Sequence, residues 1–184
     1  MKIRRNRLIL TAFALQIMML LSVISVVYGI SCLGETVVIT MTGCDPYDAL
    51  RGRYLRLNMP SSDVVLEPGS VERYKNKSMG SRTIPVYVAL DKDPGNGLSR
   101  FSYATLDRPD SSIPYIRCPA RYLGSSDIKS RVDIQPRITQ YYLNETHAQQ
   151  LDRQIRWDTD IQMRLKIWKG LYVVDGIEID GQSY

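Results

Sequence analysis

Residues 45–59 read DPYDALRGRYLRLNM, and this stretch decides how the β-rich part of the chain is arranged. It opens on an Asp-Pro turn signal and then re-enters an extended segment. Leu50, Tyr54 and Leu57 are predicted to be the apolar anchors of that segment. Because Leu57 has the opposite parity to the other two, Gly52 is predicted to seat a β-bulge that changes the buried face. The stretch thus predicts the turn and the strand on which a β-sheet is registered.

The same stretch holds the residues predicted to form a binding site. Its acids and arginines stand close together in the sequence. A guanidinium binds anionic groups through two parallel hydrogen bonds, so one hypothesis is a recognition site for a polar ligand or partner. The competing and favoured hypothesis is structural: Asp45 caps the turn, Asp48 accepts backbone amides and Arg51 pairs with an acid. The candidate binding positions are Asp45, Asp48, Arg51, Gly52, Arg53, Tyr54 and Leu57.

The N-terminal segment is predicted to be a membrane anchor. Residues 8–30 carry no charge, and about 20 apolar helical residues cross a hydrocarbon core of roughly 30 Å. Four basic side chains precede them, Lys2, Arg4, Arg5 and Arg7. Because basic residues stay on the cytoplasmic side, we expect a basic cytoplasmic tip over residues 1–7. A single-pass anchor in the cell membrane would follow over residues 8–30, and one extracytoplasmic domain over residues 31–184.

Two alternatives remain open for this segment. A cleaved signal peptide has a shorter apolar region and a small-x-small exit site, whereas the tripeptide at residues 27–29 begins with a bulky valine. A lipoprotein signal would make Cys32 the acylated residue, but Gly29 stands where a large aliphatic residue is usual. The uncleaved anchor is therefore the preferred interpretation.

The basic character of the chain is confined to its N-terminus. The net charge is +5, and the N-terminal tip supplies four of these charges. The remainder is close to neutral, so no nucleic-acid partner is predicted. There is no Cys-x-x-Cys, and His147 is the single histidine, so the sequence predicts neither a metal site nor a cofactor.

Three cysteines lie beyond the predicted span. Outside the cytoplasm a pair of thiols can oxidise. Cys44 and Cys118 are the candidate disulfide, because Cys32 lies next to the membrane. Connectivity cannot be deduced from sequence, and three free thiols are the alternative.

The rest of the chain alternates short strand patterns with turn signals. β-Branched runs, apolar–polar alternation and turns at residues 93–97 and 169–170 indicate about eight strands. The predicted strands cover residues 34–42, 49–59, 83–90, 99–106, 115–123, 128–143 with a break at Pro136, 161–168 and 171–179. Residues 61–79 are predicted to be a loop with room for a short helical turn.

A single late helix is predicted after these strands. Asn144 is a good N-cap, and apolar residues then recur at helical spacing to about residue 158. The predicted fold is therefore mainly β within the α+β class. It is an antiparallel sheet or barrel-like domain with the late helix packed on it.

The opening stretch also carries a family resemblance. It resembles the motif that names the GDYXXLXY family, membrane-anchored proteins of unknown function, at Asp45, Pro46, Asp48, Leu50, Arg51, Gly52, Tyr54 and Leu57. The C-terminal part is also similar, at residues 141–143, 145, 169–172 and 179–181, while the middle matches weakly. Two positions depart from the motif, because Arg53 replaces its Asp and Met59 its final Tyr. The resemblance implies no activity, but it implies a multi-spanning membrane protein as the class of partner.

Three functional hypotheses follow. The preferred one is a membrane-anchored extracytoplasmic accessory or interaction module, non-enzymatic and acting beside a larger membrane protein. The alternative is a domain that binds a small polar or envelope ligand through the Asp45–Tyr54 end. The least favoured is a membrane-bound hydrolase with a serine nucleophile and a lysine base. Its candidate residues are Ser61, Ser62 or Ser78 with Lys75 or Lys77.

Overall fold

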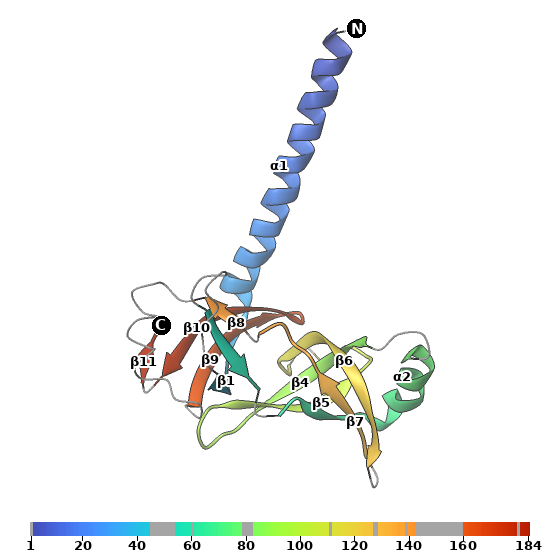
Figure 1. Cartoon of the computed structure of the whole chain (residues 1–184), viewed down its shortest axis with the longest axis vertical. Helices are drawn as coiled ribbons and strands as arrows, with labels where there is room; N and C mark the ends of the chain where they lie inside the picture. Colours follow the sequence, from blue (N-terminus) through green and yellow to red (C-terminus); the bar gives the residue numbers. More distant parts are fainter. Residues whose placement is uncertain are drawn as a thin grey trace.

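The computed structural model describes residues 2–44, 54–59, 61–78, 83–110, 112–126, 129–138, 140–142, 160–179 and 181–184. Three parts are seen in Figure 1: a long N-terminal helix, a sheet at its base, and a barrel beside the sheet. We name the second part the terminal sheet, because strands from near both ends of the chain build its centre.

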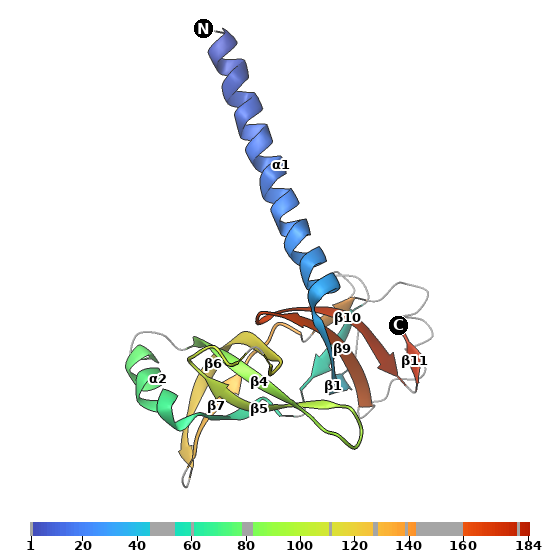
Figure 2. The same cartoon turned by 180° about the vertical axis from the view of Figure 1, so that it is seen from behind.

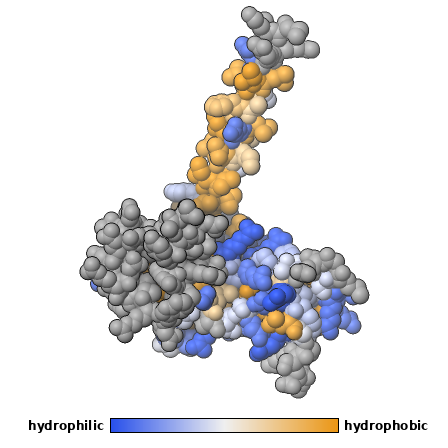
Figure 3. Space-filling view, viewed as in Figure 1, coloured by the Kyte–Doolittle hydropathy of each residue, from blue (hydrophilic) through white to orange (hydrophobic). Residues whose placement is uncertain are grey.

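Helix α1 (Lys2–Leu33) stands clear of the rest of the molecule (Figure 1). Its segment Asn6–Leu33 is long and apolar enough to cross a membrane, and its apolar side chains are uncovered along its length (Figure 3). Water does not tolerate so large a bare apolar surface, whereas lipid does. The helix therefore supports membrane anchoring of the chain. The side of the membrane on which the β-rich body lies is predicted from the N-terminal charges alone.

The terminal sheet contains six strands. They are β1 (Glu35–Cys44), β2 (Tyr54–Asn58), β8 (Gln140–Tyr142), β9 (Asp160–Trp168), β10 (Leu171–Ile179) and β11 (Gln182–Ser183). The order is β11-β10-β9-β1, and β1 also pairs with β2, which pairs with β8. All of these pairings are antiparallel.

The barrel contains five strands. They are β3 (Asp63–Leu66), β4 (Ile84–Lys92), β5 (Ser99–Thr105), β6 (Tyr115–Ser126) and β7 (Lys129–Ile134). Their order is β5-β3-β7-β6-β4, and pairing of β4 with β5 closes the ring. Between β3 and β4 come the 3-10 turn η1 (Pro68–Ser70) and helix α2 (Val71–Ser78), which lies at the end of the barrel farthest from α1 (Figures 1 and 2).

One core runs through both β-parts. Strand β9 shows why: its residues 161, 163, 165 and 167 are buried while their neighbours are not, the period of two expected of a half-buried strand. The same cluster continues through Val86, Ile116 and Val132 of the barrel, each fully buried. Sheet and barrel therefore fold around a shared interior.

Contacts among the described residues join the sheet to the barrel and to the segment that follows β7. Ile39 of β1 pairs in parallel with Ser99 of β5. Arg117 N of β6 donates to Gly170 O at the β9–β10 turn, 2.9 Å away. Tyr172 of β10 accepts a hydrogen bond from the Arg137 amide at 2.9 Å. These contacts fix the barrel relative to the sheet, and through it relative to α1.

The two predicted turns are confirmed. At residues 93–97, Asp93 Oδ1 accepts the Gly95 amide at 2.9 Å and Gly97 adopts a φ of 72°. At the β9–β10 turn, Lys169 and Gly170 have φ of 51° and 83°. Positive φ at both central residues matches the right-handed twist of an antiparallel hairpin.

Several other predictions are corrected. The sheet is not wholly antiparallel, because β3–β5 and β1–β5 pair in parallel. The prediction of a loop over residues 61–79 is wrong for most of its length, because residues 63–78 contain β3, η1 and α2, and β3 completes the barrel. The short helical turn predicted there is confirmed by η1 and α2. The break at Pro136 is confirmed, since β7 ends at Ile134 and β8 starts at Gln140. The late helix and the Gly52 bulge lie outside the described residues.

Candidate functional site

Most of the predicted site lies outside the described residues. This applies to Asp45, Asp48, Arg51, Gly52 and Arg53. Their grouping into a charged cluster, and its role in recognition, therefore stay a prediction.

The strands on either side of that stretch are described. β1 pairs antiparallel with β2, and Gly43 and Cys44 face Leu57 and Arg56. The Tyr54 backbone continues this register into β8, where it faces Tyr142. Leu57 is fully buried in the core. β1 and β2 therefore pair as neighbouring strands, as predicted for the strand before the motif stretch and the strand within it.

The described part of the chain contains a cleft at the junction of sheet and barrel. Its volume is about 440 Å³, within the range of small-molecule sites. It opens where β1 and β5 touch at a single residue pair, because their pairing extends no further. The lining residues come from β1, β3 and β5 and the segments before them: Ile39, Thr40, Ser61, Asp63, Leu98, Ser99, Arg100 and Phe101.

Asp63 gives this cleft its chemical character. Its Oδ2 accepts Arg131 Nη1 at 2.7 Å. Its Oδ1 is buried and has no hydrogen-bond partner among the described residues. A buried carboxylate oxygen without a donor is uncommon, because desolvating it is costly. Asp63 and Arg100 therefore give the cleft a charged side beside an apolar wall that includes Ile39 and Phe101, while Asp63 Oδ1 itself has almost no accessible surface.

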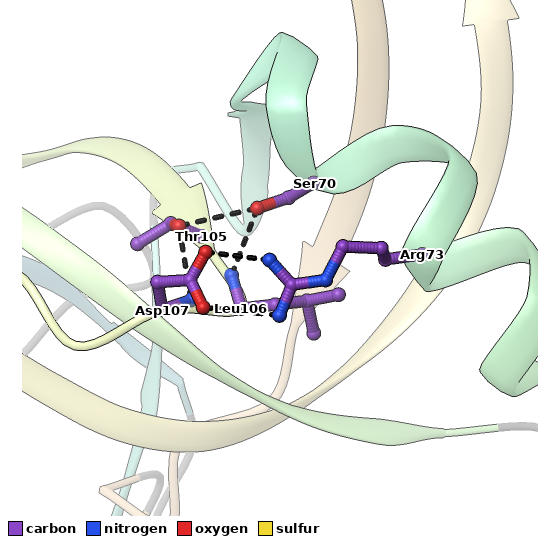
Figure 4. A network of polar contacts seen from close by, with 5 residues as sticks. All are labelled: Ser70, Arg73, Thr105, Leu106 and Asp107. Atoms are coloured by element: carbon purple, nitrogen blue, oxygen red, sulfur yellow. Dashed lines mark hydrogen bonds and ion pairs between the residues drawn. The ribbon is translucent and has the colours of Figure 1, made fainter.

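A second polar cluster joins α2 to the end of β5 (Figure 4). Ser70 and Thr105 are both buried, with their hydroxyl oxygens 3.2 Å apart. Ser70 Oγ accepts the Leu106 amide at 3.1 Å. Arg73 donates two hydrogen bonds to Asp107, at 2.6 and 3.0 Å. Arg73 lowers the pKa of Asp107, chiefly through this hydrogen bonding.

This cluster has a complete structural explanation. The two hydroxyls satisfy backbone amides where β5 ends, since Thr105 Oγ1 also accepts the Asp107 amide at 3.2 Å. The ion pair lies on the surface, with both side chains more than half exposed. No ligand is needed to account for any of these groups.

The residues proposed for a serine–lysine pair do not meet through their functional atoms. Ser78 Oγ donates to the Lys75 carbonyl oxygen, one turn earlier in α2, at 2.9 Å. Ser61 Oγ bonds the Asp63 carbonyl oxygen, and it lines the junction cleft without a lysine. Among the described residues no serine hydroxyl is hydrogen-bonded to a lysine amine, so the hydrolase hypothesis gains no geometric support.

Cys118 is a free and almost fully buried thiol. Burial raises its pKa to about 12, so the group is protonated at neutral pH and is a poor nucleophile. The Cys44 side chain lies outside the described residues. Cys118 forms no disulfide in the structure, and its pairing with Cys44 on oxidation stays a prediction.

The sequence did not predict the junction cleft, although one of its lining residues, Ser61, was a candidate for another site. The available signal was the run D-V-V-L at residues 63–66, β-branched and bounded by Ser61-Ser62 and Pro68-Gly69. Reading it as a strand would have placed Asp63 on a sheet. No local pattern predicts that Asp63 lies near Thr40 and Arg100, because the parallel pairings of β5 with β1 and β3 bring these residues together.

Comparison with known proteins gives one match. The family model described as GDYXXLXY protein matches residues 16–177, most of the chain. A search of curated proteins and a search of solved structures both found no match. The matched range includes the motif stretch, the barrel strands β3 to β7, all of β9 and β10 up to residue 177. The chain is a member of the GDYXXLXY protein family.

Proposed function

We propose that this chain is a membrane-anchored extracytoplasmic interaction module, non-enzymatic, that acts beside a larger membrane protein. The observation that carries the proposal is the junction between α1 and the β-rich body, which has no linker. Gly34 alone separates α1 from β1, and its amide donates to Ile30 O at 2.9 Å. A body joined in this way holds one orientation at the membrane surface.

The packing at this junction supports the same proposal. Ile30, in the last turn of α1, is only 4% exposed, whereas the apolar side chains earlier in the helix are bare. A Cβ at Gly34 would lie 2.3 Å from Ile30 O, so any other residue would force the backbone to shift. A rigid mount suits a module that presents a fixed surface to a neighbour in the same membrane.

Site-specific photo-crosslinking in native membranes tests this proposal. A photoreactive residue at Leu123, half exposed on the barrel, and another at Phe13, on the bare part of α1, sample the two levels of the molecule. We expect both positions to trap the same multi-spanning membrane protein. Adducts with lipid alone, or with unrelated proteins at each site, would remove the main support for an accessory role.

The proposed orientation has a separate test. A periplasmic-type reporter enzyme fused after Tyr184 should be active, and a cytoplasm-dependent reporter at the same place should be silent. The reverse pattern would put the β-rich body in the cytoplasm. It would overturn the proposed location without bearing on the fold.

A second function is favoured by the junction cleft, which Asp63 and Arg100 line beside apolar residues: binding of a small polar ligand. Native mass spectrometry of chain released from its own membranes tests it. Asp63→Asn should lose a bound small molecule that Asp133→Asn retains, because Asp133 pairs with Arg121 and does not line the cleft. Identical spectra for wild type and both variants would reject this function.

A further inference from the structure

Helix α1 is longer than a bilayer core requires. Its apolar segment has 28 residues, which corresponds to about 42 Å, against a hydrocarbon thickness of roughly 30 Å. If the hydrocarbon core of the bilayer begins just after Arg7, the about 20 helical residues needed to cross it end near Val27. The last turns of α1 then lie in the headgroup layer. Tyr28 is 70% exposed at that level, where tyrosine and tryptophan are enriched.

The β9–β10 turn lies at the same level as these last turns. Figures 1 and 2 both show it close to the base of α1. A Cβ placed on Gly29 would be 4.0 Å from Trp168 Cζ3. Lys166 Nζ donates to Ser31 O at 2.8 Å. The tip of this hairpin is therefore held against the part of the helix that the bilayer argument assigns to the headgroup layer.

The tip combines apolar and basic side chains. We call Trp168, Lys169 and Leu171 the hairpin tip. Leu171 is 48% exposed, and Lys169 Nζ lies 4.7 Å from the centroid of the Trp168 ring. An indole, an exposed leucine and a lysine that can extend toward phosphates form a typical interfacial set.

Further cations flank the tip on the barrel. Gly170 packs against the Tyr115 ring, where an added Cβ would come within 2.9 Å. Arg108 lies over that ring and Arg117 over the neighbouring Tyr87 ring, at 5.8 and 6.0 Å from the centroids. Within the described part of the chain neither arginine forms an ion pair, nor does Lys169.

The described surface to the right of the base of α1 in Figure 3 is mostly hydrophilic. Acids also lie near this region: Glu35 faces Ile167 across β1 and β9, Asp91 lines a pocket with Glu35 and Lys92, and Asp110 follows Arg108 by two residues. The tip and the two tyrosine rings beside it carry the cations Lys169, Arg108 and Arg117, while Lys166 is already engaged by the carbonyl end of α1. The charge at the tip is therefore complementary to an anionic membrane surface.

We propose that the hairpin tip, with Arg108 and Arg117, docks onto anionic phospholipid headgroups of the bilayer that α1 spans. This inference rests on the proposed membrane anchor and adds to it a second attachment point. Trp168 and Leu171 enter the interfacial layer, and the three cations face lipid phosphates. With two points of attachment, the body cannot rotate freely about the axis of α1.

The test uses the fluorescence of Trp168 in the full chain. The chain has two tryptophans, so Trp157→Phe leaves Trp168 as the sole reporter. The variant is reconstituted in vesicles of phosphatidylcholine, or of equal parts phosphatidylcholine and phosphatidylglycerol, with lipids brominated at shallow or deep positions. We expect shallow quenching of Trp168 and protection from aqueous iodide, both stronger with phosphatidylglycerol and weaker at high salt.

Matched charge variants decide whether the basic residues act locally. Lys169→Gln should reduce the ratio of lipid-shielded to water-exposed Trp168 by about fivefold, the factor for about 1 kcal/mol per basic residue at an anionic surface. Lys77→Gln, which removes the same charge from α2 at the far end of the barrel, should leave the ratio unchanged (Figure 2). Equal effects of the two variants would show general charge attraction and overturn the proposed site.

A carbonate wash of the same vesicles separates the inference from the anchor on which it rests. If the chain resists extraction but Trp168 is quenched by iodide and not by brominated lipid, the anchor stands and the docking of the hairpin tip is overturned. If carbonate releases the chain, the anchor fails and the docking inference fails with it.

Discussion

The terminal sheet and the barrel contribute to their shared core by opposite routes. The barrel uses one nearly continuous segment, residues 63–134, and closes on itself through β4 and β5. The centre of the terminal sheet pairs residues 35–42 with residues 160–167, across most of the chain. The barrel closes early in the sequence, whereas the sheet forms only when the chain ends meet.

This difference separates two roles. The ring of pairings gives each described barrel strand two neighbours, while the terminal sheet ends in short strands, β11 with two residues and β8 with three. Only the sheet is continuous with α1, through Gly34 and the contacts of Lys166 and Trp168. The sheet therefore attaches the body to the membrane helix, and the barrel is the unit that it holds.

The largest expected effect on stability comes from truncating one buried isoleucine to alanine in the barrel and one in the terminal sheet. Ile134→Ala in the barrel and Ile161→Ala in the sheet each remove a buried isoleucine, 1% and 0% exposed. Each should lower the free energy of unfolding by about 2–5 kcal/mol. Chemical denaturation in detergent micelles measures the loss, with Leu123→Ala as the surface control at about 0.5 kcal/mol or less.

Because the core is shared, we expect one unfolding transition in both variants. Two transitions in Ile161→Ala alone would mean that the barrel folds without the sheet. That result would show that the terminal sheet and the barrel are two separate folding units.

The next effect concerns the contact between the two parts. Gly170→Ala and Gly97→Ala both force a side chain into positive φ, 83° and 72°, which costs about 1–2 kcal/mol. At Gly97 nothing lies within 4 Å of the new Cβ, whereas at Gly170 the Tyr115 ring is 2.9 Å away. Gly170→Ala should therefore lose about 1–3 kcal/mol more than its control, as overpacking does. Equal losses would mean that the turn does not hold the barrel.

Sequence reasoning succeeded where local chemistry decides. Turn residues 93–97 and 169–170, the alternation along residues 161–168 and the apolar run of α1 each predict their own conformation, and all are observed. It failed at residues 61–79, because β3 is only four residues long and gains its stability from pairing with β5 and β7. Local propensity carries no information about such partners.

The same limit applies to candidate sites. The motif stretch was predicted as a candidate site because charged residues are dense in its sequence, which can be seen without a structure. Asp63 was not predicted as a site residue, because it lines a cleft that forms only where residues of β1, β3 and β5 come together. Trp168 ends the strand predicted over residues 161–168, and only the position of the last turns of α1 places it at the proposed membrane surface.

A smaller effect tests how α2 is held on the barrel. Tyr74 is 1% exposed, and its hydroxyl donates to Ala120 O of β6 at 2.6 Å. Tyr74→Phe leaves that buried carbonyl without a partner and should cost about 1–3 kcal/mol. Tyr87→Phe, whose ring stacks at the surface under Arg117, should change stability by about 0.5 kcal/mol or less. Hydrogen exchange should show faster opening of α2 in the first variant only.

The smallest effect is the pH dependence of the Arg73–Asp107 pair. Arg73 lowers the pKa of Asp107 in the folded chain below the ordinary value of 3.8. Above that value the carboxylate is charged in both folded and unfolded chains, and the full stabilisation is present. As the pH falls below it, unfolded chains take up the proton first, so the contribution declines and vanishes once the folded pKa is passed.

Asp107→Asn removes this contribution and supplies the comparison. The difference in denaturation midpoint between wild type and Asp107→Asn should be positive near neutral pH and shrink toward zero in strong acid. Asp110→Asn, an exposed acid of the same loop without an ion pair among the described residues, should show no such trend. Both partners of the pair are more than half exposed, so water and salt screen their attraction. A large, salt-insensitive difference would therefore mean that the cluster joining α2 to β5 holds the barrel more firmly than its buried hydroxyls alone explain.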